Sequence, residues 1–174
     1  MKQWVKRLID VDGVRLATFE FDDPAGDTSA VSGAGNPAGP ATPENAERPT
    51  VLFVHGWPDT HEVWTEVAAR LSDDVRVVAY DQPGHGRSRL GDGPAEVRDL
   101  GHVLQCVLDA AVPTGRIVLA GHSMGGMTVM AWGGLYPDEV ASRLAGVALV
   151  ATAPNLSQRK AIRGEAMAMR VLTR

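Results

Sequence analysis

The sequence predicts an α/β fold, in which helices cover both faces of a mostly parallel β-sheet. Four short runs are apolar at consecutive positions, and segments with helical spacing alternate with them along the chain. Runs that are apolar on both faces are typical of strands buried in a parallel sheet, and alternating strands and helices build such a sheet. The predicted strands are Val51–Val54, Val75–Tyr80, Ile117–Ala120 and Val147–Val150, and the predicted helices are His61–Leu71, Pro94–Ala111 and Met124–Tyr136.

Two extended segments, Lys6–Val11 and Val14–Phe21, precede this pattern. They meet at Asp12-Gly13, a dipeptide that favours a two-residue hairpin turn. Residues 22–49 are rich in Gly, Pro, Ala, Ser and Asp, and we interpret them as a flexible loop. In the first predicted helix the apolar side chains that share one face are Val63, Val67 and Leu71.

The last segment, Ser157–Arg174, has helical spacing and carries five basic residues against one acidic residue. A basic amphipathic helix can bind anionic lipid. We prefer the interpretation of a partly covered helix whose basic face lies in solvent.

Composition and charge exclude several classes of protein. The chain has 174 residues and a formal net charge of -4, whereas a nucleic-acid binder needs a basic surface. The length favours one domain, residues 1–174. No secretory signal and no apolar run long enough to span a bilayer is visible, so we expect a cytoplasmic protein.

Cysteine and histidine usage gives no sign of a metal site or a disulfide. Cys106 is the only cysteine, and we expect it to be a small buried apolar side chain. The five histidines are scattered without the close spacing of metal ligands. A glycine-rich stretch, Gly33–Gly39, has no strand leading into it and no helix after it, which argues against a dinucleotide site. We therefore predict no cofactor and no metal.

The strongest chemical signal is the sequence Gly121-His122-Ser123-Met124-Gly125. It follows a predicted strand directly and precedes a predicted helix, which is the context of a nucleophile elbow. In such a turn the serine hydroxyl is exposed above the sheet, and glycines remove side chains that would collide. The helix N-terminus adds N–H groups and a positive dipole end beside developing negative charge. Ser123 is therefore the candidate nucleophile.

A second turn, His55-Gly-Trp-Pro58, follows the predicted strand Val51–Val54. The N–H group of Trp57 and the N–H group of Met124 can together form an oxyanion hole for a tetrahedral intermediate. We expect the His55 side chain to have a structural role.

These residues identify a resemblance to the α/β-hydrolase superfamily. Three landmarks occur in the family's order, namely His55–Pro58, Asp81–Ser88 and Gly121–Gly126. The resemblance implies Ser123 as nucleophile, oxyanion N–H groups from Trp57 and Met124, and support of the elbow by Gly121, His122 and Gly125. It also implies a structural role for Asp81–Ser88. The match runs from the first hairpin to residues 147–153, which resemble the family's sixth strand.

A serine nucleophile needs a histidine base and an acid, and in this fold both follow the serine along the chain. All five histidines precede Ser123. Of the acidic residues beyond it, Asp138 and Glu139 look like the end of the elbow helix, and Glu165 lies in the basic terminal segment. A rearranged triad through His85 or His102 has no support from the sequence. The resemblance thus implies a chain that is incomplete at its C-terminus, truncated after the sixth strand, with residues 157–174 as the start of a lid helix.

We therefore predict a serine hydrolase of small carboxylic esters or related acyl substrates, inactive as the isolated chain. Relatives with an aspartate nucleophile open epoxides or displace halide, whereas a serine forms an acyl-enzyme. Two alternatives remain open: a non-catalytic protein that binds a small ligand on the same fold, and a cofactor-free perhydrolase or carbon–carbon hydrolase. An edge left unpaired by the sixth strand, Val147–Val150, also predicts self-association.

Overall fold

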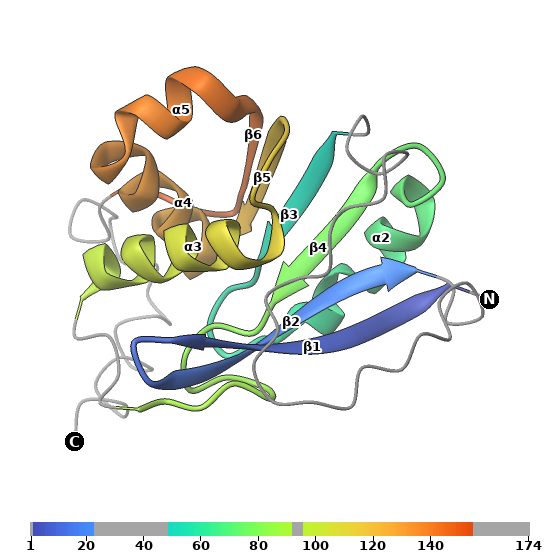
Figure 1. Cartoon of the computed structure of the whole chain (residues 1–174), viewed down its shortest axis with the longest axis horizontal. Coiled ribbons are helices and arrows are strands. Elements are labelled where there is room, and N and C mark those ends of the chain that lie inside the picture. Colours follow the sequence, from blue (N-terminus) through green and yellow to red (C-terminus); the bar gives the residue numbers. More distant parts are fainter. Residues whose placement is uncertain (1, 23–48, 92–95, 155–174) are drawn as a thin grey trace, which may run out of the picture.

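A six-stranded sheet in the order β1-β2-β4-β3-β5-β6 forms the centre of the molecule (Figure 1). This computed structural model describes residues 2–22, 49–91 and 96–154. The strands are β1 (Gln3–Val11), β2 (Val14–Asp22), β3 (Thr50–Val54), β4 (Arg76–Tyr80), β5 (Ile117–His122) and β6 (Leu144–Val150). The helices are η1 (His61–Trp64), α2 (Thr65–Leu71), α3 (Val97–Ala111), α4 (Met124–Leu135) and α5 (Pro137–Arg143).

The N-terminal hairpin has the turn that its sequence predicts. β1 and β2 pair antiparallel from Gln3 opposite Asp22 to Val11 opposite Val14. Asp12 and Gly13 both have positive φ, of 51° and 79°, as a two-residue hairpin turn requires. β2 then joins the rest of the sheet by pairing antiparallel with β4.

The other strands pair in parallel, and their side chains alternate between two separate cores. On β3, Leu52 and Val54 belong to a core built with α3 and α4. Val51 and Phe53 belong to a second core, which contains Trp64 and Ala68 from η1 and α2. Because consecutive strand residues point to opposite faces, a continuously apolar run fills both cores. The predicted α/β class, with helices on both faces of a mostly parallel sheet, is confirmed (Figure 1).

The first helical region packs through a face that the spacing of its valines does not predict. Val63 and Val67 are 49% and 41% exposed, whereas Trp64 and Ala68 are buried. The Trp64 ring stacks on Phe53 with 4.6 Å between the ring centroids. The large aromatic side chain therefore decides which face of this region meets the sheet.

Two other details differ from the sequence interpretation. Residues Asp138 and Glu139 lie in the first turn of a separate helix, α5, which begins at Pro137, instead of ending α4. Proline is favoured at the first position of a helix, where its missing N–H group is not needed. Cys106 packs against the core of α3 and α4 but is only partly buried.

Three predicted features lie outside the described residues. They are most of the loop 22–49, the first residues of the helix predicted from Pro94, and the helix predicted for 157–174.

One edge of the sheet is apolar and open to solvent. β6 pairs only with β5 among the described strands, and its residues Val147, Leu149 and Val150 are each about half exposed. Within residues 2–22, 49–91 and 96–154, no helix has the length and apolar character needed to cross a membrane. The expected cytoplasmic location stays a prediction.

Candidate active site

Ser123 lies in the sharp turn between β5 and α4, at the N-cap position of the helix, and its side chain makes no capping hydrogen bond. Its backbone has φ 51° and ψ -115°, a conformation that residues other than glycine rarely adopt. Such a residue stores about 1–3 kcal/mol of strain and persists only where the surrounding contacts enforce it. The turn therefore has the strained backbone of a nucleophile elbow.

The glycines of the elbow are required by close backbone approach. A Cβ atom on Gly125 would overlap the carbonyl oxygen of Val54, at the end of β3. A Cβ atom on Gly121 would lie 2.6 Å from the carbonyl oxygen of Gly125. Any larger residue at either position would push α4 away from the sheet, and Ser123 would move with it.

The C-terminal end of β6 holds the backbone of the elbow. The Ser123 N–H group donates a hydrogen bond to the Val150 carbonyl at 3.0 Å. The Thr152 hydroxyl donates to the Ser123 carbonyl at 2.6 Å. Both backbone polar groups of the strained residue are thus tied to the end of β6 and the residues just after it.

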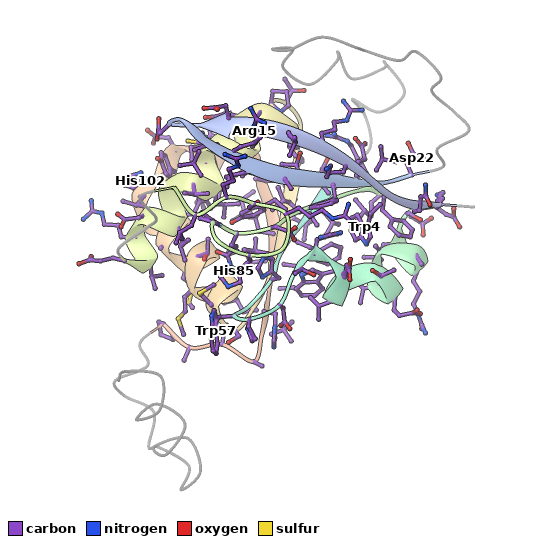
Figure 2. The ribbon with its side chains drawn as sticks, turned by 90° about the horizontal axis from the view of Figure 1, so that it is seen from below. Trp4, Arg15, Asp22, Trp57, His85 and His102 are labelled. Carbon is purple, nitrogen blue, oxygen red and sulfur yellow. The ribbon has the colours of Figure 1, made fainter. Side chains whose placement is uncertain are left out.

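The turn that carries Trp57 lies directly against Ser123. A Cβ atom on Gly56 would be 3.0 Å from the Ser123 Cβ atom, so there is no room for a side chain on Gly56 beside Ser123. The Trp57 side chain is 55% exposed and lies at the periphery of the molecule (Figure 2). Met124 is the first residue of α4, and an N–H group at that position has no partner within its helix. The structure therefore brings the turn that carries Trp57 and the start of α4 together at Ser123.

His55 is fully buried beneath this turn and holds it in place. Its Nε2 atom accepts a hydrogen bond from the Gln82 N–H group at 2.8 Å, and its Nδ1 atom lies 2.8 Å from the Gly56 carbonyl. Because Nε2 accepts, the proton must be on Nδ1, and the ring is neutral. Burial lowers the His55 pKa below its usual value of 6.5. These contacts suit the structural role expected for this side chain.

We expect the chain to lose stability as the pH falls below 6.5 because of His55. Between its lowered folded pKa and its unfolded pKa, the unfolded state binds a proton that the folded state refuses. The free energy of unfolding should fall by up to about 1.4 kcal/mol per pH unit in that window. Urea unfolding of the wild type and His55→Gln between pH 7.5 and 5.5, about one unit either side of the usual histidine pKa, measures this. If the free energy of unfolding falls equally steeply with pH in the two proteins, His55 is not the group responsible for the loss of stability.

Asp81 anchors the loop that follows β4 and the start of η1. Its carboxylate accepts hydrogen bonds from the His61 N–H group at 2.9 Å, from His61 Nδ1 at 2.8 Å and from the Arg87 N–H group at 2.8 Å. Burial alone would raise the Asp81 pKa, but the hydrogen bonds outweigh it and hold this pKa below its ordinary value. The Ser88 hydroxyl donates to the Asp81 carbonyl at 2.6 Å. These contacts fit the structural role implied for 81–88.

His122, the predicted support of the elbow, faces Asp59, which directly follows the turn His55–Pro58 (the oxyanion turn). Its Nδ1 atom lies 3.4 Å from a carboxylate oxygen of Asp59, and both side chains are about one-third exposed. At this distance the two side chains make no well-formed hydrogen bond. The pair joins the two turns at the rim of the site.

The structure places the other two histidines considered as bases in different surroundings. His102 lies on α3, and its Nδ1 atom is 2.8 Å from the hydroxyl of Tyr136, at the C-terminal end of α4. Since α4 has 12 residues, that end is about 18 Å from Ser123. His85 lies near His55, with 5.3 Å between ring centroids, and its Nδ1 atom is 3.0 Å from the Pro83 carbonyl (Figure 2).

The residues that tie the site together were only partly visible in the sequence. Gln82, Thr128 and Thr152 make buried or partly buried contacts to the two turns, and no motif of the sequence gives any of them an individual role, although Gln82 lies in the landmark 81–88. Thr128 follows Met124 by one helical turn, and Gln82 is a polar residue just after a buried strand. Both positions therefore give a weak indication that the side chain faces the site. Among the described residues, no group of three or more His, Cys, Asp or Glu side chains could hold a metal ion.

Comparisons with known proteins agree with this architecture. A family model described as alpha/beta hydrolase fold matches residues 49–166, which is more than half of the chain. A serine hydrolase-like protein of Danio rerio is 37% identical over 98 residues, covering 53% of this chain and 28% of its own length. The 3-oxoadipate enol-lactonase 1 of Acinetobacter baylyi is 35% identical over 94 residues, covering 54% of this chain and 34% of its own.

A solved structure shows the same fold over nearly the whole chain. The crystal structure of a membrane phospholipase A matches with a TM-score of 0.70 and 23% sequence identity, covering 96% of this chain and 46% of that protein. The chain thus spans less than half the length of each of these three proteins.

Proposed function

The chain belongs to the alpha/beta hydrolase fold family, and on that basis we propose that it carries the nucleophile of a serine hydrolase for carboxylic esters or related acyl substrates. The observation that supports this most strongly is the strained backbone of Ser123, in contact with the turn that carries Trp57. Strain of this kind is typical of a nucleophile elbow, in which the turn exposes the serine hydroxyl above the sheet.

The proposed reaction is acyl transfer to Ser123. The Ser123 hydroxyl oxygen attacks the ester carbonyl carbon, its proton passes to a base, and the alcohol leaves with a proton. The N–H groups of Trp57 and Met124 donate to the oxyanion that forms on the former carbonyl oxygen. One such donor contributes about 2.7–4 kcal/mol to transition-state stabilisation. Water then hydrolyses the acyl-enzyme.

The base and the acid of this mechanism come, in our proposal, from outside residues 1–174. No histidine follows Ser123 in the sequence. His55 is fixed beneath the turn as a neutral ring, and His102 lies at the far end of α4. Without its base, a serine triad loses on the order of 10⁶ in kcat, so the isolated chain should be nearly inactive by ordinary assay.

Imidazole in the buffer tests the proposal, because it can take the place of the absent base. We expect p-nitrophenyl acetate to acylate the chain at a rate that rises with imidazole concentration and exceeds that of imidazole alone. Chloroalkanes and epoxides, which need a carboxylate nucleophile, should not react. If the chain binds small esters tightly but is never acylated, the non-catalytic binding protein is the better description. Peracid formation from acetate and hydrogen peroxide would favour the perhydrolase.

We also propose that the chain associates with a second copy of itself through β6. Val147 and Leu149 are each 46% exposed on a strand that has a free edge among the described strands. An apolar strand edge is a template for pairing with another chain. The average molar mass of the wild type in light scattering should rise with protein concentration, and Val147→Lys should suppress this rise. A wild type that stays monomeric at all concentrations would contradict the proposal.

A further inference from the structure

Gln82 connects the oxyanion turn to the helix that follows the nucleophile. It is fully buried and directly follows Asp81, beyond the end of β4. Its side-chain amide donates to the His55 carbonyl at 2.6 Å. The side-chain oxygen accepts from the hydroxyl of Thr128, on α4, at 3.1 Å. One amide group thus bridges two elements that come from distant parts of the sequence.

The backbone of the same residue adds a third contact. The Gln82 N–H group donates to His55 Nε2 at 2.8 Å, so both the carbonyl and the ring of His55 are held by one residue. The opposite ring nitrogen of His55 lies 2.8 Å from the Gly56 carbonyl. Gly56 in turn contacts Ser123. The position of the Trp57 N–H group relative to Ser123 therefore depends on where Gln82 holds His55.

The hydrogen bonds of Gln82 leave little freedom for another arrangement. Thr128 is fully buried, and its single hydroxyl proton is shared between the Gln82 side-chain oxygen and the Met124 carbonyl, each 3.1 Å away. If the Gln82 side chain were lost, the His55 carbonyl would lose a donor in a place that water does not reach. A buried polar group without a partner is unfavourable, so the turn would shift to find one.

We propose that Gln82 is a positioning residue of the hydrolase, which sets the distance between the oxyanion turn and Ser123 by holding His55 and Thr128 at the same time. This inference rests on the proposed function, since it concerns the geometry of that reaction. Gln82 does not touch the substrate and acts through His55 and Gly56.

Gln105 provides a matched control. It is also a buried glutamine with two side-chain hydrogen bonds, accepting from Trp132 Nε1 and donating to Asp109, both at 2.8 Å. It lies on α3, and neither of its side-chain hydrogen bonds is to the oxyanion turn or to the elbow. Gln82→Met and Gln105→Met therefore remove the same side-chain amide. Only Gln82→Met removes the hydrogen bond from that amide to the oxyanion turn.

Hydrogen exchange of the whole chain tests the proposal without any need for activity. The probe is the segment 55–60, in which the Asp59 N–H group donates to the Gly56 carbonyl at 2.9 Å. We expect its exchange to be at least about tenfold faster in Gln82→Met and within about twofold of wild type in Gln105→Met. If Gln82→Met does not fold, Thr128→Val, which keeps the side-chain volume, breaks the same bridge. Equal exchange of the segment in the two variants would overturn the proposal.

Labelling of Ser123 by a fluorophosphonate in imidazole buffer gives the second measurement. In Gln82→Met the rate of the covalent step should fall by at least about tenfold with the binding constant of the probe unchanged, because oxyanion contacts form in the transition state. Gln105→Met should label like the wild type, and equal labelling of both variants would overturn the inference while the proposed function stands. If the wild type never labels but the exchange rates differ as expected, the hydrolase function is wrong and the anchoring by Gln82 is supported.

Discussion

Replacing Ser123 with alanine is expected to remove all acylation of the chain by aryl esters in imidazole buffer, leaving only the reaction of imidazole itself. Among the described residues, Ser123 is the only one with a side-chain hydroxyl whose φ is positive, at 51°. In the wild type, imidazole takes the place of the absent base and the oxyanion N–H groups stabilise the transition state of attack by Ser123, so acylation should exceed the reaction of imidazole alone. Ser142→Ala, on the exposed side of α5, is the control and should react like the wild type.

The stability of Ser123 variants separates the nucleophile from the fold. Alanine retains the Cβ atom and so keeps the strain of a positive φ. Ser123→Gly relieves it and should raise the free energy of unfolding by about 1 kcal/mol, while also losing all acylation. A Ser123→Ala chain that is folded and still acylated would remove Ser123 from the mechanism.

Replacing Gly125 with alanine is expected to have the largest effect on stability, a loss of about 3 kcal/mol or failure to fold. The new methyl group would overlap the backbone oxygen of Val54, and neither the helix nor the strand can move without disturbing the sheet. Chemical denaturation of the variant measures the loss. Acylation should disappear together with the native contact between the elbow and the Gly56 turn.

Gly134 provides the matched control on the same helix. A Cβ atom at Gly134 meets nothing within 4 Å, and the residue is exposed. Gly134→Ala should therefore stabilise the chain by about 0.5–1 kcal/mol through helix propensity alone. If both glycine variants changed stability by the same amount, close approach at the elbow would not explain Gly125.

Local sequence pattern was enough to predict the sheet and most of its connections. The Asp12-Gly13 turn, the continuously apolar strands and the glycines around Ser123 each reflect constraints that act within a few residues. β6 begins three residues before its predicted start, at Leu144, because strand pairing with β5 extends through residues that are less apolar. The alpha/beta hydrolase family to which the three landmarks point matches residues 49–166.

Most of what the sequence could not predict depends on contacts between distant residues. The choice of Trp64 over Val63 as the buried side of η1 depends on the Phe53 ring that it meets in the sheet. The separate start of α5 is a local effect that the sequence leaves ambiguous, because Pro137 is equally compatible with the end of one helix and the first position of the next. The bridge through Gln82 joins residues 55, 82 and 128, which no periodic pattern relates.

The most direct test of the central claim is to locate the adduct formed when the chain reacts with a fluorophosphonate in imidazole buffer. Digestion and mass spectrometry should place a single phosphonyl group on the Ser123 side chain, in the peptide that spans the end of β5 and the start of α4. An adduct spread over several exposed hydroxyl groups, or one placed on His85 or another residue, would contradict the account.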